Sequence, residues 1–99
     1  MRRDFAVFIT PAAERSCKKL PHKVADFVFR ELAGILGKNP FVGKPLAPPL
    51  VLLRSFHFSC DGQPYRAAYE IKESSQKVVI HLVGYRGDFY ARLRRLLGV

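Results

Sequence analysis

We predict an α+β fold for this 99-residue chain, with the element order β-α-α-β-β-β-α. An apolar run opens the chain, and two segments with helical periodicity follow it. After residue 50 come three strand-like segments separated by short turn sequences, and such consecutive strands form an antiparallel meander. A last helical segment ends the chain. Domains commonly contain about 100–150 residues, so we expect residues 1–99 to form a single domain.

The first half of the sequence predicts one strand and a helical hairpin. Residues 5–9 are apolar on both faces of a strand, which indicates an interior strand. Thr10 and Pro11 are typical of a helix start, so a first helix is predicted over residues 11–19. A second helix is predicted over residues 21–37, where apolar residues form one stripe. The stripe consists of Val24, Phe27, Val28, Leu32, Ile35 and Leu36.

The second half predicts the meander and a final helix. A connecting loop rich in proline covers residues 41–49. Asp61 and Gly62 supply turn chemistry between the first two strands of the meander. The first strand of the chain is expected to join this sheet, and the helices to cover one face, which leaves the other face concave and basic. The predicted strands are residues 50–58, 65–71 and 77–83, and the final helix covers residues 88–97.

The charge of the chain indicates an anionic partner. Seventeen Lys and Arg residues against eight Asp and Glu residues give a formal net charge of +9. The excess is spread along the whole chain and is not confined to a tail. A folded domain with this charge attracts polyanions, of which nucleic acid is the first candidate and an acidic protein the second. A basic soluble protein without a nucleic-acid role is the simpler alternative.

Several other classes of protein do not fit the sequence. No apolar run approaches the roughly 20 residues of a membrane helix, and the apolar stretch after Asp4 is shorter than a secretory signal. We therefore expect a cytoplasmic protein with no membrane role and reduced cysteines. Cys17 is expected to be buried and Cys60 to lie in a loop. The histidines and cysteines share no ligand spacing, so no metal and no cofactor is expected.

Cationic and aromatic residues of the second half are expected to converge at one end of the sheet. They are Arg54, His57, Arg66, Arg86 and Tyr90. RNA cleavage without a metal needs a base for the 2′-OH, cations for the phosphorane and an acid for the 5′-oxygen. Arginine matches phosphate oxygens, and tyrosine can stack on a base. For any one of these residues, a solvated surface cation or a core-edge aromatic is the commoner role.

Short motifs run in order through nearly the whole chain. The first half contains a strand, Thr10-Pro11 with Ala13, Lys18-Lys19-Leu20-Pro21, and a helix closing at Asn39-Pro40. The second half contains Gly43-Lys44-Pro45-Leu46, Leu53-Arg54-Ser55, Pro64-Tyr65-Arg66-Ala67-Ala68-Tyr69-Glu70-Ile71, and the run from Val78 to Tyr90. Each motif is short, but their order and spacing together resemble the RelE/ParE superfamily of bacterial type II toxins.

This resemblance implies a toxin that a cognate antitoxin holds inactive in a hetero-oligomer. In the RelE branch the activity is ribosome-dependent cleavage of mRNA by 2′-OH attack without a metal, which inhibits translation. The ParE branch inhibits DNA gyrase instead. The RelE pattern implies that Arg66 binds phosphate, that Arg86 is a transition-state cation or acid partner, and that Tyr90 orients or stacks on the substrate base. Because Arg66 and Tyr90 occur together, we favour the RelE branch.

The chain departs from the RelE pattern on the strand before the Tyr-Arg strand. The pattern has a lysine pair there that acts near the 2′-OH, whereas residues 50–54 contain no lysine. His57 is the preferred base, because an ordinary histidine has a pKa near 6.5. Lys44 and His81 are the alternatives, and His81 more often has a structural role in such an apolar strand. The residues expected to bind RNA are Lys44, Arg54 and Arg92.

Three functions are therefore open: an mRNA endoribonuclease, a ParE-like gyrase inhibitor, and a non-catalytic basic RNA-binding domain. The third lacks an RNP-like pair of aromatic residues on adjacent strands. An adjacent reading frame for a small acidic or amphipathic protein favours the first two. We expect the antitoxin to wrap the surface with an amphipathic helix or strand and to bring carboxylates toward the basic patch.

Overall fold

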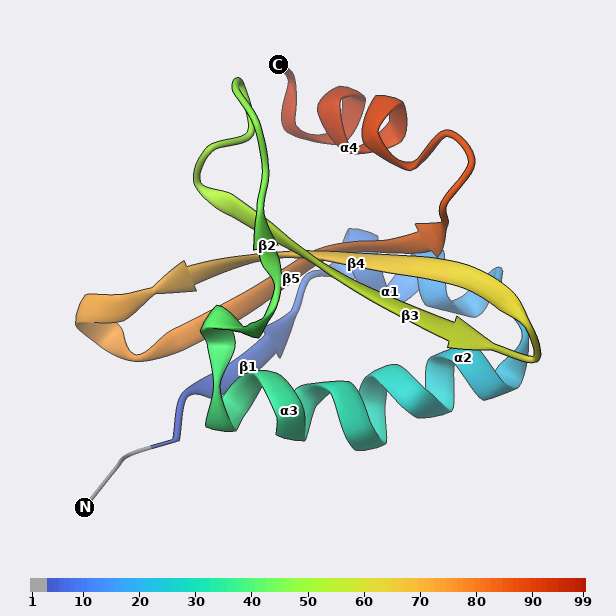
Figure 1. The fold of residues 1–99 in the computed structure, drawn as a ribbon, viewed down its shortest axis with the longest axis horizontal. Coiled ribbons are helices and arrows are strands. Elements are labelled where there is room, and N and C mark those ends of the chain that lie inside the picture. The colour runs from blue at the N-terminus through green and yellow to red at the C-terminus, as the bar shows by residue number, and fades with distance from the viewer. Residues whose placement is uncertain (1–3) are drawn as a thin grey trace.

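The computed structural model describes residues 4–99, and its centre is a five-stranded sheet with the order β1-β5-β4-β3-β2 (Figure 1). The strand β1 runs parallel to β5, and the other neighbouring pairs are antiparallel. The predicted α+β class and the central meander are confirmed. The strands are β1 (Ala6–Ile9), β2 (Lys44–Pro45), β3 (Leu53–Cys60), β4 (Gln63–Lys72) and β5 (Lys77–Tyr85).

Helices connect and flank the sheet. The helices are α1 (Pro11–Lys18), α2 (His22–Asp26), α3 (Ala33–Lys38) and α4 (Phe89–Leu97), with a π-helical segment η1 (Phe27–Leu32) that joins α2 to α3 and short 3-10 turns η2 (Pro40–Val42) and η3 (Glu73–Ser75). The predicted start of the first helix is confirmed, because the Thr10 side chain accepts a hydrogen bond from the Ala13 N–H. Among residues 4–99, no helix is long and apolar enough to cross a membrane.

Two apolar clusters lie on opposite faces of the sheet. The helix α1 and the continuous α2–α3 helix cover the larger one, whereas α4 covers the smaller one (Figure 1). The expectation that all helices cover one face is therefore wrong. Phe89 and Leu93 of α4 are fully buried against Ala68 and Leu82, because the strands present apolar side chains on this face too. The basic surface that we expected on this face is limited to the part that α4 leaves open.

The first strand lies at an edge of the sheet, so the prediction of an interior strand is wrong. β1 pairs only with β5, through four residues. Val7 and Ile9 pack against the larger apolar cluster, whereas Phe8 on the other face is 49% exposed. The Lys77 ammonium lies 5.6 Å from the centre of the Phe8 ring, so a cation covers part of this ring. Both faces of β1 carry apolar side chains, but only one of the two faces is buried.

The third strand begins later and ends later than predicted. Residues 50–52 form a turn, in which the Leu53 N–H donates to the Leu50 carbonyl, and β3 continues to Cys60. Cys60 thus ends a strand and does not lie in a loop, whereas Cys17 is buried as predicted. Asp61 and Gly62 have φ values of 51° and 77°, which suit a two-residue hairpin turn. This turn sets the register of β3 and β4.

Candidate active site

The register of the central strands brings His57 and Arg66 together. His57 on β3 lies directly opposite Arg66 on β4, and Arg66 lies opposite Gly84 on β5. Directly opposite residues of a sheet share one face, so His57 and Arg66 both belong to the face that α4 covers. The Arg66 guanidinium carbon lies 4.9 Å from the centre of the Tyr90 ring, which belongs to α4. Such a cation–π contact orients the guanidinium.

A pocket of about 200 Å³ lies where β3 and β4 approach their turn. His57, Arg66 and Arg86 line it together with Phe58, Ser59, Pro64 and Tyr65. The Arg86 N–H donates to the Pro64 carbonyl at 3.2 Å, so the segment after β5 is held against the start of β4. Arg86 and His57 are exposed, and Arg66 is partly buried. The structure thus brings His57, Arg66 and Arg86 to one open basic pocket, with Tyr90 against Arg66.

The electrostatics of this pocket act on His57. Partial desolvation, then Arg66, then Lys44 lower the pKa of the His57 imidazole below its ordinary value of 6.5. Lys44 lies opposite Ser55 on β3, two residues before His57, and therefore shares the face of His57. Both observations place Lys44 beside the pocket. A histidine with a lowered pKa is unprotonated at neutral pH, which is the form that accepts a proton.

Arg54 does not lie at this pocket, so the expectation that it converges there with His57, Arg66 and Arg86 is wrong. It lies three residues from His57 on the same strand, and side chains of a strand alternate between faces. Its guanidinium donates to the Gly43 carbonyl at 2.7 Å and to the Phe41 carbonyl at 3.3 Å, and it stacks on the Phe41 ring. Arg54 thus fastens the segment before β2 on the other face of the sheet.

Arg92 lies on the opposite side of Arg66 from His57. A Cβ atom at Gly84 would approach Nη1 of Arg92 to 2.8 Å, so the guanidinium rests against the backbone of β5. From there Arg92 borders a groove of about 400 Å³ between α1 and α4. The cations that line this groove are Arg15, Lys19, Arg92 and Arg95. Of these only Arg92 was among the predicted RNA-binding residues.

The other alternative base, His81, lies outside the pocket. Its Nε2 atom lies 3.1 Å from Oε1 of Glu70, and both side chains are mostly buried. Glu70 lies four residues beyond Arg66 on β4, which corresponds to about 13 Å along a strand. His81 also occupies the irregularity between β4 and β5, because Ala68 pairs with Leu82 and Tyr69 pairs with Ile80. Its contacts are those of a structural histidine.

A buried tyrosine positions the segment that carries Lys44, and no sequence pattern predicts this role. The Tyr69 hydroxyl donates to the Pro40 carbonyl at 2.7 Å and accepts from the Gly43 N–H at 2.9 Å. Burial raises the pKa of this hydroxyl, so it remains protonated and able to donate. Gly43 leaves space for the ring, since a Cβ atom there would collide with the Tyr69 hydroxyl. Lys44 follows directly.

The sequence predicted neither the groove cations of α1 nor Arg95. A usable signal exists, because Arg15 and Lys19 are four residues apart and Arg92 and Arg95 are three apart, so each pair shares a helix face. Among residues 4–99, no group of three or more His, Cys, Asp or Glu residues could hold a metal ion.

Comparisons with known proteins agree with this fold. The family model described as "ParE-like toxin of type II bacterial toxin-antitoxin system" matches residues 7–94. A chain of the toxin-antitoxin complex RelBE2 from Mycobacterium tuberculosis is 32% identical, with 89% of this chain and 98% of that chain covered and a TM-score of 0.73. A mutant of the E. coli toxin RelE in the free state shares the fold at 12% identity, with coverage of 97% and 98% and a TM-score of 0.74. The comparison with curated proteins found no match.

Proposed function

We propose that this chain, which belongs to the ParE-like toxins of type II bacterial toxin–antitoxin systems, cleaves mRNA on the ribosome without a metal and so inhibits translation. The observation that carries the proposal is the single pocket lined by His57, Arg66 and Arg86. Two cations and a histidine that is neutral at pH 7 are the groups that 2′-OH attack on a phosphodiester requires. The similarity to a chain of the RelBE2 complex supports the RelE branch.

In the proposed mechanism His57 accepts the proton of the attacking 2′-OH. Arg66 and Arg86 bind the non-bridging oxygens of the phosphorane, where two negative charges develop. Arg86 also donates a hydrogen bond to the leaving 5′-oxygen. An arginine stays protonated in proteins, so the proton that this oxygen finally takes comes from water. The products are a 2′,3′-cyclic phosphate and a 5′-hydroxyl end.

Tyr90 serves the proposed reaction by position. Its ring holds the Arg66 guanidinium and borders a second groove, of about 380 Å³, between α4 and the segment 45–50. Prolines and leucines of that segment, with Arg94 at the border, offer apolar surface on which an unstacked base can rest. We expect Tyr90→Ala to weaken cleavage mainly through loss of substrate positioning.

The decisive experiment adds the purified chain to translating ribosomes and maps the 5′-hydroxyl ends of the mRNA. We expect cleavage by the wild-type chain but not by Arg86→Ala. The control variant is Lys38→Ala, which removes an exposed cation of α3 and should still cleave. Circular dichroism shows whether each variant is folded. Equal cleavage by the wild type and by a folded double variant, Arg66→Ala with Arg86→Ala, would overturn the proposed active site.

Gyrase inhibition is the second candidate function, because the matching family model carries the ParE name. Such an activity needs a protein surface and no catalytic group. The toxin is expressed in cells, and amino-acid incorporation and the DNA-damage response are followed during the growth arrest to distinguish the two functions. Immediate loss of amino-acid incorporation without a DNA-damage response supports the RNA cleavage. A DNA-damage response that precedes the loss of translation supports gyrase as the target.

We further propose that the chain acts in the cytoplasm and that the product of an adjacent gene is its antitoxin. The RelBE2 chain at 32% identity comes from a toxin-antitoxin complex. Leu52 and Val99 are 78% and 54% exposed and line one apolar hollow, and Leu96, 43% exposed, lies among the cations of the groove between α1 and α4. An amphipathic, acidic segment can cover both kinds of surface. Calorimetry with the product of the adjacent gene tests this partner, and an absence of affinity contradicts it.

A further inference from the structure

The groove between α1 and α4 is a second basic site, distinct from the candidate active site. Arg15 lies on α1, Lys19 directly follows this helix, and Arg92 and Arg95 lie on α4. The remaining lining residues are Ala12, Ser16, Leu82 and Leu96, so no carboxylate lines the groove. Four cations that face one hollow repel one another, and an anionic ligand relieves that repulsion.

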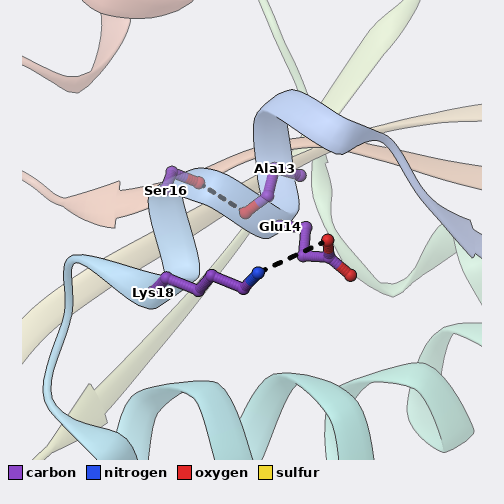
Figure 2. Close-up of polar contacts among 4 residues, drawn as sticks. All are labelled: Ala13, Glu14, Ser16 and Lys18. Carbon is purple, nitrogen blue, oxygen red and sulfur yellow. Dashed lines mark hydrogen bonds and ion pairs between the residues drawn. The ribbon is translucent and has the colours of Figure 1, made fainter.

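The two helices present these cations for a simple geometric reason. Positions 12, 15, 16 and 19 fall on one side of a helix, because residues three and four apart are neighbours on its surface. Ser16 ties this side of α1 to the sheet, since its hydroxyl donates to the Ala13 carbonyl and accepts from the Val83 N–H. Figure 2 shows the ion pair of Lys18 with Glu14 on the other side of α1.

The groove continues the candidate active site across the sheet. Arg66 lies opposite Gly84, and the Arg92 guanidinium rests on Gly84. Neighbouring strands lie about 4.8 Å apart, so one strand spacing separates Arg66 from the place where Arg92 crosses β5. Beyond Arg92 come the cations of α1. Cations therefore follow one another from Arg66 through Arg92 to Arg15 and Lys19.

We propose that this groove binds phosphates of an RNA strand that extends from the candidate active site. The proposal rests on the proposed function, because it takes the scissile phosphate to lie between Arg66 and Arg86. A single strand that enters the pocket must leave it along one side, and the groove offers cations at the next positions on that side. Arginine and lysine in an open groove bind the backbone without reading its sequence.

The test measures how binding depends on RNA length. The probes are 2′-O-methyl RNAs of four and twelve nucleotides, which cannot undergo 2′-OH attack. For the wild-type chain we expect the longer RNA to bind more tightly. The double variant Arg15→Gln with Lys19→Gln should bind the twelve-nucleotide RNA on the order of tenfold more weakly than the wild type. Its affinity for the four-nucleotide RNA should be unchanged. The slope of log K against log salt should fall by about 1.4, which is about 0.7 for each lost phosphate contact.

The matched control removes the same charge elsewhere. Lys18→Gln with Lys38→Gln takes two exposed cations from outside the groove and should retain the dependence on length. Gly84→Ala tests the other side of the groove, which Arg92 of α4 lines. Its Cβ atom meets only the flexible end of Arg92 below 3.4 Å, so it should displace that guanidinium and lower the twelve-nucleotide affinity without unfolding the chain.

A second arm identifies the source of the phosphates. If ribosomal RNA supplies them, the groove variants bind both short RNAs normally but lose affinity for the small ribosomal subunit, and this result overturns the proposal that the substrate strand occupies the groove. Unchanged affinity for RNA and for the subunit overturns the proposal, and so does a loss of antitoxin affinity alone. A wild-type chain that cleaves mRNA while its groove variants bind RNA normally contradicts the groove but not the proposed function. A wild-type chain that neither cleaves nor binds RNA contradicts both.

Discussion

Arg66 and Arg86 are held in different ways, and this difference bears on what each can do in the proposed reaction. Arg66 is partly buried and lies over the Tyr90 ring, so its guanidinium is oriented before any substrate arrives. Arg86 is exposed on the segment after β5, where only its backbone is fastened to Pro64. Arg66 therefore suits a fixed phosphate contact, whereas Arg86 can follow the phosphorane as charge develops.

Alanine at either arginine is expected to lower the cleavage rate on the order of 10²–10³, the usual cost of removing one preorganised charge donor. Within residues 4–99 neither side chain donates a hydrogen bond to another residue, so the free energy of unfolding should change little. Single-turnover cleavage and urea unfolding measure the two effects separately. An Arg66→Ala variant that cleaves at the wild-type rate would remove Arg66 from the mechanism.

The pKa of His57 predicts the pH dependence of cleavage. Desolvation, Arg66 and Lys44 hold this pKa below 6.5, so the imidazole is the proton-accepting form at neutral pH. Lowering the pH through this pKa protonates the base, and the rate should fall with a midpoint below 6.5. Lys44→Gln removes one of the causes and should move the midpoint upward, toward 6.5. The measurement is the single-turnover rate between pH 4.5 and pH 8.

His57→Ala should lower the plateau rate by roughly 10²–10⁴ and abolish this acidic limb. His81→Ala is the matched control, because its imidazole is engaged with Glu70 away from the pocket. An acidic limb that survives in His57→Ala assigns the base to another group, and Lys44 is then the next residue to test.

The hairpin of β3 and β4 explains why much of the candidate active site could be predicted. A two-residue turn at Asp61 and Gly62 pairs Cys60 with Gln63, and counting back three residues on each strand pairs His57 with Arg66. The turn sequence therefore predicts that these two side chains meet. Strand geometry also explains why the prediction for Arg54 is wrong. Arg54 lies an odd number of residues from His57, so its side chain belongs to the other face of the sheet.

In the continuous α2–α3 helix, the α-helical periodicity of the sequence does not predict the buried face correctly. Its fully buried residues are Val24, Val28, Leu32 and Leu36, a strict spacing of four. In a regular α-helix each such step turns about 40° past the previous side chain. The π-helical segment η1 has more residues per turn and reduces this drift, so all four stay on one face. The predicted stripe of 3.6 periodicity wrongly includes Ile35, which is 37% exposed.

The segment between α3 and β2 depends on one buried hydroxyl, and Tyr69→Phe is expected to expose that dependence. The variant leaves the Pro40 carbonyl and the Gly43 N–H without their partner, which typically costs about 1–3 kcal/mol. Tyr85→Phe, at an exposed ring, is the control and should be neutral. Urea unfolding measures both. A neutral Tyr69→Phe would contradict the role of Tyr69 as the anchor of this segment.

The sequence predicts the net charge of the protein but not where that charge gathers on the folded surface. The net charge of +9 is evenly distributed along the chain, so only the fold concentrates it. The pocket follows from strand register, which is local. The groove depends on how α1 and α4 flank β5, and these helices are about 70 residues apart in the sequence. No local pattern determines that packing, and the edge position of β1 escaped prediction for the same reason.

The same arrangement predicts that antitoxin and RNA compete for this chain. Both proposed ligands are anionic, and the exposed Leu96 lies among the cations of the groove, so an acidic amphipathic antitoxin segment would cover this leucine and the cations together. A carboxylate-bearing segment over these cations leaves no charge for a phosphate backbone. We therefore expect stoichiometric antitoxin to release a labelled twelve-nucleotide 2′-O-methyl RNA completely, as measured by fluorescence anisotropy. The RNA should in turn weaken apparent antitoxin affinity. A stable ternary complex of toxin, antitoxin and RNA would show instead that the antitoxin binds another surface and inhibits without covering the basic one.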